Sequence, residues 1–313
     1  MVDLVTLGEA MLRLSPPTGE RLETARELDC QVGGAESNVA ATAARLGLDT
    51  VWLSKLPDSA LGRRVVSELR RHGAKPRVCW SEDGRQGTYY LEAGGAPRGS
   101  SVVYDRENAA VQTATPNELD TDAIEDAELF LTTGITPALS TTLFETTRSL
   151  LSTDTRTAFD LNYRGKLWSE AEARDAYEEL LPAVDLLFAP ERDVRSVLGY
   201  DGDPTALTAR LREEYGCETV VLTRGEKGAF ADTGDQTVEQ STIAAETVDA
   251  VGTGDAFVGG YLSQALRGES VERSLSYGAA TAALKRTIAG DIAVVSEAEV
   301  ERVLDDEYDG IDR

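Results

Sequence analysis

Short apolar runs alternate with helical patterns along most of this chain, and this alternation constrains its fold more than any other feature. A regular succession of strands and helices builds a parallel sheet covered by helices on both faces, with ligands at the carboxyl ends of the strands. From residue 116 onward the strands that we expect are 129–133, 157–161, 184–189 and 218–223, followed by a pair at 228–232 and 237–240. The helices that we expect are 140–151, 169–181, 192–198, 205–215, 256–267, 271–286 and 297–304.

The first third of the chain combines this pattern with a different one. Strands at 2–8 and 50–55, an alanine-rich helix ending at Leu46 and a helix at 60–72 continue the alternation. Short strands separated by glycine, a pattern typical of hairpins, are expected at 10–15, 28–32, 88–92 and 101–106. We therefore predict one domain spanning residues 1–313, with a small discontinuous β-sheet formed by approximately residues 10–32 and 86–106. The acidic tail, residues 305–313, is expected to be frayed.

Residues 249–262 read as a glycine-rich turn followed at once by a helix. Gly252 and Gly254 permit positive φ and the close approach of a ligand, and Thr253 can cap the helix. The N-terminus of a helix also offers free N–H groups and a positive dipole end, so this stretch predicts an anion site suited to a phosphate. Asp255 in the first turn is either a plain capping carboxylate or a group that accepts a proton or meets a metal.

Polar residues follow two other expected strands, at the places where a parallel sheet binds ligands. Asp160, Asn162 and Arg164 follow one strand; the acid and the amide are also common in turns, whereas a guanidinium there suits a carboxylate or phosphate. Residues 221–228 are equally well explained as a hairpin turn or as a nucleotide-binding turn. The pair at 33–34 leaves bare backbone at a helix start, which serves either a ligand or a tight turn.

The composition excludes several classes of protein. A formal net charge of −24 argues against binding to nucleic acid, and no run approaches the roughly 18 apolar residues that a membrane span needs. The N-terminus lacks the features of a signal peptide. Three widely spaced cysteines and a single histidine argue against a disulfide framework, a zinc site and a histidine-based triad. We expect a cytoplasmic protein, whose acidic, lysine-poor surface resembles that of proteins from salt-loving organisms.

Residues 249–262 resemble, almost letter for letter, the C-terminal signature of the ribokinase-like (PfkB) carbohydrate kinases, and residues 32–47 resemble their N-terminal signature. Residues 134–140, 160–168 and 104–106 are similar to one branch, the 2-keto-3-deoxygluconate kinases, so the resemblance covers essentially the whole chain. It implies a ribokinase-like α/β fold, doubly wound, in which the small sheet is a lid over the sugar. ATP and Mg²⁺ are the implied cofactors, a sugar acid the implied substrate, and a homo-oligomer formed through the lid the implied assembly.

The resemblance also implies roles for individual residues. Asp255 would take the proton of the sugar hydroxyl, and the backbone of Gly252, Thr253 and Gly254 would hold the transferring phosphoryl group. The residues implied in substrate binding are Gly34, Asn38, Tyr90, Tyr104, Arg106, Arg164 and Asp291. The residues implied in ATP binding are Thr223, Gly225, Gly228, Gly252, Gly254 and Ala279. Taken one at a time, tyrosines at strand spacing are usually packing residues, and alanines on a helix equally suit helix packing.

A sugar acid needs a cationic clamp that a neutral sugar does not, and Arg106 with Arg164 can supply one. The metal site is less well defined. Many members carry an Asn-Glu-x-Glu run that helps to organise the magnesium shell, whereas this chain has Pro190-Glu191-Arg192-Asp193. We therefore assign no metal ligand. Because Mg²⁺ keeps several waters and takes few protein carboxylates, activity does not require a dedicated cage.

The function that we expect is ATP-dependent phosphorylation of 2-keto-3-deoxygluconate, or also of its C4 epimer 2-keto-3-deoxygalactonate, at the 6-hydroxyl group. Two rival functions remain. A fructokinase or another neutral-sugar kinase of the same family would not need the carboxylate of the substrate. A non-catalytic sugar-binding or regulatory protein would be favoured by a missing base or a broken anion loop, and both are intact in this sequence.

Overall fold

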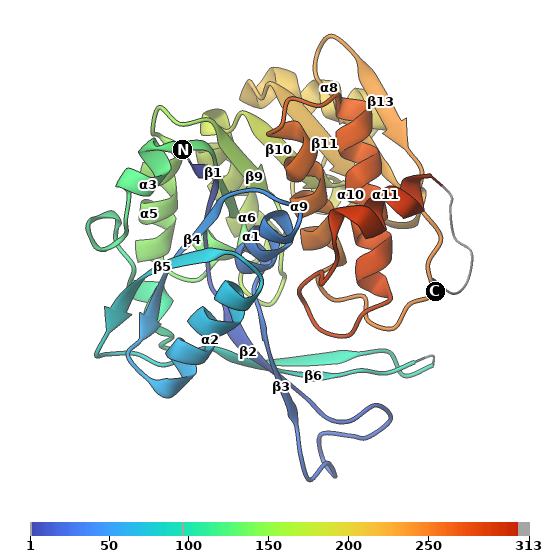
Figure 1. Ribbon diagram of the computed structural model, residues 1–313. Coiled ribbons are helices and arrows are strands. Elements are labelled where there is room, and N and C mark those ends of the chain that lie inside the picture. Colours follow the sequence, from blue (N-terminus) through green and yellow to red (C-terminus); the bar gives the residue numbers. More distant parts are fainter. Residues whose placement is uncertain (1, 96, 306–313) are drawn as a thin grey trace.

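The computed structural model describes residues 2–95 and 97–305, and in that part the main sheet has nine strands (Figure 1). Their order is β13-β12-β11-β10-β9-β8-β1-β4-β5, and all neighbours pair in parallel except β11–β12 and β12–β13. The strands are β1 (Val2–Leu7), β4 (Thr50–Pro57), β5 (Lys75–Ser81), β8 (Ala127–Thr133), β9 (Thr157–Asp160), β10 (Leu186–Pro190), β11 (Thr219–Thr223), β12 (Ala229–Asp232) and β13 (Thr237–Gln240). The predicted doubly wound, mostly parallel α/β fold is confirmed.

Helices cover both faces of this sheet. The helices are α1 (Ala35–Arg45), α2 (Ala60–Arg71), α3 (Asp122–Glu125), α4 (Ile135–Ala138), α5 (Thr141–Leu151), α6 (Glu170–Leu180), α7 (Glu191–Ser196), α8 (Pro204–Tyr215), α9 (Thr253–Ala265), α10 (Val271–Arg286) and α11 (Glu297–Leu304). None of the helices in the described part combines the length and the apolar character that crossing a bilayer requires.

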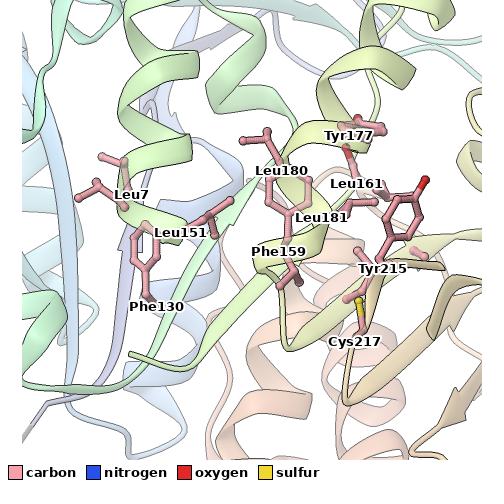
Figure 2. Packing of buried hydrophobic residues seen from close by; sticks show 14 of the residues in the cluster. Leu7, Phe130, Leu151, Phe159, Leu161, Tyr177, Leu180, Leu181, Tyr215 and Cys217 are labelled. Atoms are coloured by element: carbon pink, nitrogen blue, oxygen red, sulfur yellow. Dashed lines mark hydrogen bonds between the residues drawn. The ribbon is translucent and has the colours of Figure 1, made fainter. Parts of the chain in front are cut away.

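The sheet has a core on each face because successive strand residues point to opposite sides. On one side Phe130 and Phe159 pack with Leu151 of α5 and with Leu180 and Tyr177 of α6, as Figure 2 shows. On the other side the neighbouring strand residues pack against α1, α9 and α10. Burial of these apolar side chains is the main term that favours folding, and it fixes the edge at which the strand ends meet.

A second sheet stands off the main one (Figure 1). It contains β2 (Met11–Ser15), β3 (Asp29–Gly33), β6 (Thr88–Glu92) and β7 (Ser101–Asp105), in the order β3-β2-β6-β7. The parallel pairing of β2 with β6 joins the two stretches that the sequence marked as hairpin-like. We call this sheet the lid sheet.

Three details differ from the sequence prediction. The edge strand β5 was not predicted, because Lys75, Pro76 and Arg77 obscure any apolar period; an edge strand tolerates proline since one side needs no ladder hydrogen bonds. The short helices α3 and α4 were not predicted either. Helix α9 begins at Thr253, three residues before the predicted start. The tail 306–313, expected to be frayed, lies outside the described residues.

β1 is the point at which the order of the sheet reverses. It pairs with β4 on one side and with β8 on the other, so the chain first builds the sheet in one direction and later in the opposite direction. In such sheets the crevice beyond the carboxyl ends at the reversal point is where ligands bind. The residues that follow β1, β8, β9, β10 and β11 therefore meet at one edge.

Candidate active site

Two cavities lie at this edge of the sheet, and they meet at the glycine-rich loop. The first, of about 400 Å³, lies between the strand ends and the lid sheet. The second, of about 650 Å³, lies between the turn after β11 and helices α9 and α10. Both cavities are lined by Thr223, Ala250, Thr253 and Gly254. A ligand group placed at this loop is therefore reached from two sides. We call the two spaces the lid cavity and the α10 cavity.

The loop presents free backbone donors. Gly252 is the N-cap of α9, with φ 79°, and no side chain caps the helix. Within the described residues, the N–H groups of Gly252, Gly254 and Asp255 have no acceptor. The prediction that Thr253 caps the helix is wrong, because Thr253 is the first helical residue and its hydroxyl donates to Ala250 O at 2.7 Å. The N-terminus of α9 consequently remains open to an anion.

Two glycines in this loop serve different needs. A Cβ at Gly252 would lie 1.9 Å from the carbonyl oxygen of Asp291, so both the positive φ and the close packing exclude other residues. A Cβ at Gly254 would meet nothing within 4 Å. The backbone of Gly254 therefore faces open space shared by the two cavities. Bare backbone of this kind at a helix N-terminus suits a phosphate or another anion.

Asp255 projects from the first turn of α9 into the lid cavity. Its Oδ2 accepts a hydrogen bond of 2.7 Å from Nδ2 of Asn38, which lies in the first turn of α1. Burial raises the pKa of Asp255 to about 6, although the hydrogen bond from Asn38 and the charge of Arg164 lower it. The carboxylate is thus ionised at neutral pH and close to the pKa that suits a general base.

Most residues predicted for substrate binding line the lid cavity: Gly34, Asn38, Tyr104, Arg106, Arg164 and Asp291. Tyr90 is the exception and corrects the prediction. β6 pairs with β7 in a register that sets Tyr89 opposite Tyr104, so Tyr89 and Leu91 face the cavity. Tyr90 pairs with Val103 on the outer face of the lid sheet, because neighbouring residues of a strand point to opposite sides.

The two arginines of the predicted clamp lie in different environments. Nη1 of Arg106 is already bound to Oε2 of Glu9 at 2.9 Å, in a pair that is almost wholly buried. Arg164 donates only to the backbone carbonyls of Asn162 and Tyr163, and no carboxylate among the described residues forms a salt bridge with it. Arg164 is therefore the cation in this cavity that is available to an anionic ligand.

Three buried carboxylates near the cavity were not assigned roles from the sequence. Burial raises the pKa of Glu9 to about 7 and that of Asp160 to about 8, and it also raises the pKa of Glu36. Glu36 accepts hydrogen bonds from the hydroxyls of Thr133 and Thr136. Glu9 and Asp160 each keep one buried oxygen without a partner in the described structure. The sequence signal that could have identified Glu9 is its position two residues after the end of β1, at the edge where the strand ends meet.

The α10 cavity contains the residues predicted for the nucleotide. Thr223, Gly225 and Gly228 line one wall, and Ala279 lines the other together with Ala282 and Ala283. These alanines lie at helical spacing on one face of α10, so their small side chains leave a smooth apolar wall. A flat apolar wall beside an anion loop suits a nucleotide, with its base on α10 and its phosphates at Gly254.

No metal cage is formed by the described residues: no three His, Cys, Asp or Glu side chains come together in a way that holds an ion. In the departing segment, Glu191 forms a 2.6 Å salt bridge with Arg195. Asp193 is fully buried and accepts hydrogen bonds from the backbone of Tyr163 and from Arg192. Both carboxylates are thus engaged within the protein.

Comparisons with known proteins agree with this architecture. Residues 1–298 match the pfkB family of carbohydrate kinases. The chain is 60% identical over 315 residues to a 2-dehydro-3-deoxygalactonokinase of Haloferax volcanii, covering 99% of each chain. It is 30% identical over 299 residues to a 2-dehydro-3-deoxygluconokinase of Bacillus subtilis, covering 93% of this chain and 91% of the relative.

Among solved structures, the chain is similar to a 2-dehydro-3-deoxygluconokinase of Thermotoga maritima, with a TM-score of 0.91 and 33% identity. That likeness covers 97% of this chain and 98% of the other. The expected family, a ribokinase-like kinase family, is confirmed. Because the family model matches residues 1–298 and the relatives compared are sugar-acid kinases, this chain belongs to the pfkB family of carbohydrate kinases and is a phosphotransferase that acts on an alcohol group.

Proposed function

We propose that the protein transfers the γ-phosphoryl group of ATP to the 6-hydroxyl of a 2-keto-3-deoxy sugar acid, with 2-keto-3-deoxygalactonate as the preferred epimer. One observation carries the proposal: the lid cavity and the α10 cavity meet at Gly254, with Asp255 on the lid side. A sugar in the lid cavity and ATP in the α10 cavity would have their reacting groups at the same loop. Such positioning is most of what phosphoryl transfer requires.

The chemistry follows from the groups at this loop. The 6-hydroxyl oxygen attacks the γ-phosphorus, and the new O–P bond forms as the bond from phosphorus to the β,γ-bridging oxygen breaks. The hydroxyl proton passes to Asp255, and ADP leaves with the electron pair. The N–H groups of Gly252, Gly254 and Asp255 stabilise charge on the equatorial oxygens. Mg²⁺, when present, would supply further neutralisation of phosphate charge, and a site without a protein cage suits an ion that keeps most of its waters.

The acid group of the substrate is supported by Arg164. Its guanidinium faces the lid cavity without a carboxylate partner, so a substrate carboxylate would complete its charge. Arg106 has a different role. Its guanidinium forms a salt bridge with Glu9 and lies 4.3 Å from the ring centroid of Tyr104. It can donate to a sugar oxygen while staying neutralised by Glu9. Of the two arginines of the expected clamp, only Arg164 lacks a salt bridge with a described carboxylate.

The epimer is supported by the relatives and by no contact within the cavity. The relative with 60% identity is named for 2-dehydro-3-deoxygalactonate, whereas relatives with 29% and 30% identity are named for the gluconate epimer. We therefore place the galactonate epimer first, ahead of the gluconate that the sequence motifs favoured, and expect both to react.

The test is ADP release in high-salt buffer with ATP and Mg²⁺, comparing 2-keto-3-deoxygalactonate, 2-keto-3-deoxygluconate and fructose at equal concentrations. Phosphorus–proton NMR of the product locates the phosphate. Reaction of both acids at O6, with the galactonate epimer faster, supports the proposal. A faster reaction with fructose would replace it with a neutral-sugar kinase, and ATP binding without transfer to any of the three would favour the non-catalytic alternative.

We also propose that the protein forms a homo-oligomer through the lid sheet. The outer face of the lid sheet carries Tyr90 and Val103, and the side chain of Val103 is 53% exposed. A second copy packed on this face would cover it. Light scattering at high salt measures the assembly; a monomer at all protein concentrations would remove the oligomer from the proposal.

A further inference from the structure

Arg13 lies in strand β2 of the lid sheet, and its guanidinium forms salt bridges with two carboxylates of the main domain. Its side chain is only 7% exposed. Nη2 contacts Oδ2 of Asp249 at 2.7 Å, Nη1 contacts Oδ1 of Asp291 at 2.7 Å, and Nε donates to Ser15 at 3.0 Å. Arg13 lines neither cavity. Any effect of Arg13 on the two cavities therefore passes through these two carboxylates.

Asp249 continues the connection into the phosphoryl-binding loop. Its Oδ1 accepts a hydrogen bond of 3.0 Å from the N–H of Val251, the residue directly before Gly252. Its Oδ2 accepts a hydrogen bond of 3.1 Å from the N–H of Gly290. The carboxylate of Asp249 thus holds the start of the loop that supplies the phosphoryl-binding N–H groups. Arg13, in the lid sheet, in turn holds the carboxylate of Asp249.

Asp291 makes a second connection. Its carbonyl oxygen packs directly against the Cα of Gly252, where a Cβ would lie 1.9 Å away. Its carboxylate is held from the lid by Arg13 and by the hydroxyl of Tyr89, which donates to Oδ2. Side chains from two lid strands, β2 and β6, therefore bind Asp291, and the backbone of Asp291 packs against the loop at Gly252.

The residues around Arg13 include equal numbers of positive and negative side chains, and one of them, Lys285, is fully buried. The ammonium of Lys285 donates to the carbonyl oxygens of Asp249 and Ile288 at 3.2 and 3.1 Å. With Arg13 it gives two cations beside the two carboxylates of Asp249 and Asp291. Removing one member leaves the opposite charge buried without compensation, which the group would relieve by moving. We call these four residues the Arg13 network.

We propose that Arg13 is a positioning residue, which couples the lid sheet to the phosphoryl-binding loop, so that the loop holds its transfer geometry only when the lid is in place over the substrate. The inference rests on the proposed placement of the γ-phosphoryl group at residues 252–255. It goes beyond that placement because it assigns to the lid a function in the transfer step as well as in covering the sugar.

The consequence is a specific kinetic signature. A misplacement of about 1 Å in a positioning shell can cost about 10²-fold in rate. Arg13→Met should therefore lower kcat by roughly 10- to 100-fold, while the KM for ATP changes little because the α10 cavity is untouched. Arg13→Lys keeps the charge but lacks the fork that reaches both carboxylates, so it should retain an intermediate kcat.

The experiment compares Arg13→Met, Arg13→Lys and the control Arg85→Met. Arg85 lies three residues before β6 and also forms a two-bond ion pair with a carboxylate of the lid sheet, that of Asp105 in β7. Both side chains are more than two-fifths exposed, and neither forms an ion pair with the loop. Steady-state kinetics, thermal melting and amide hydrogen exchange of residues 250–262 are measured for each. In Arg13→Met we expect exchange in this segment to be faster by on the order of tenfold, with Arg85→Met unchanged.

The outcomes separate this inference from the proposed function. Wild-type protein that phosphorylates no sugar acid removes the proposed function, and the hydrogen-exchange comparison still tests the coupling. Active wild-type protein with normal kcat and normal exchange in both Arg13 variants overturns the inference. A lowered melting temperature with unchanged kcat would make Arg13 merely structural and also overturn it. If Arg13→Met does not fold, Arg13→Lys provides the same two readouts.

Discussion

Nδ2 of Asn38 donates a hydrogen bond of 2.7 Å to Oδ2 of Asp255, and this contact joins the first turns of α1 and α9 across 217 positions of sequence. It holds one oxygen of the carboxylate, while Oδ1 accepts no hydrogen bond from the described residues. Asp255 lines the lid cavity. An amide donor on one oxygen stabilises the ionised form and fixes the direction of the other, which is the arrangement that a positioned base requires.

The first prediction concerns pH. The pKa of Asp255 is raised to about 6, chiefly by burial, so kcat/KM should fall as the pH drops through about 6 because the protonated carboxyl cannot accept the hydroxyl proton. Asn38→Leu removes a hydrogen bond that lowers this pKa, so the acid limb should move to higher pH. The neighbouring Ser37→Ala, which loses only a bond to Gly34 O, is the control. An unmoved limb in Asn38→Leu would contradict the assignment.

The second prediction concerns the base itself. Asp255→Asn keeps the shape of the side chain but cannot accept a proton, so kcat should fall by about 10²- to 10⁴-fold. The affinity for ATP, measured by calorimetry, should persist because the α10 cavity does not include Asp255. A change confined to KM would show that Asp255 binds substrate without acting as its base.

The third prediction separates Arg164 from Arg192, which also lines the lid cavity. Arg164→Ala should raise the KM for the sugar acid by about tenfold or more, since it removes a charged hydrogen-bond donor. Arg192→Ala should have little effect, because Arg192 is 76% exposed and its Nε is paired with Asp193 at 2.9 Å. Steady-state kinetics with the acid substrate decide between them. Equal and normal KM values in both variants would remove Arg164 as the carboxylate ligand.

The fourth prediction concerns stability. Burial raises the pKa of Asp160 from 3.8 to about 8 in the folded protein, so folding favours the protonated form. The contribution of this group to stability is present below about pH 4 and is lost as the pH rises toward 8. Asp160→Asn should therefore melt at a higher temperature than wild type at pH 8, and the difference should vanish at low pH. The exposed Asp154→Asn serves as control; the opposite sign at pH 8 would refute the argument.

The fifth prediction follows from the net charge of −24. Self-repulsion of this size destabilises the compact state, and salt screens it: the Debye length falls from about 10 Å at ~0.1 M to about 3 Å at ~1 M. The melting temperature should rise with KCl over this range. Sucrose at equal osmolality is the control, because it acts by exclusion from the surface without screening charge. An equal rise in sucrose would show that screening is not the cause.

Local pattern was sufficient for most of the fold. The helices 271–286 and 297–304 were predicted to the residue, because Ser270 and Ser296 cap them and their apolar spacing is regular. β5 escaped prediction because an edge strand can carry Lys75, Pro76 and Arg77, and only its pairing with β4 makes it a strand. The anion loop could be found because glycine at positive φ before a helix is a local requirement.

The sequence predicted the site less well wherever the role of a residue depends on a contact with a distant part of the chain. Tyr89 and Tyr90 are adjacent and identical, and only the register of β6 with β7 determines which of them faces the cavity. Arg106 and Arg164 looked alike as cations, yet the first forms a salt bridge with Glu9 and the second forms none with a described carboxylate. Arg13 had no motif at all, because its partners Asp249 and Asp291 lie more than 200 residues away.

The sequence by itself determined the alternating strands and helices, the glycine-rich turn before α9 and the aspartate in its first turn, because turn conformation and apolar period are properties of neighbouring residues. The tertiary structure decided which side chains share a cavity and which charges are already paired. Strand register and the approach of the lid sheet depend on contacts between distant segments, and burial then sets the pKa of each carboxylate that these contacts enclose.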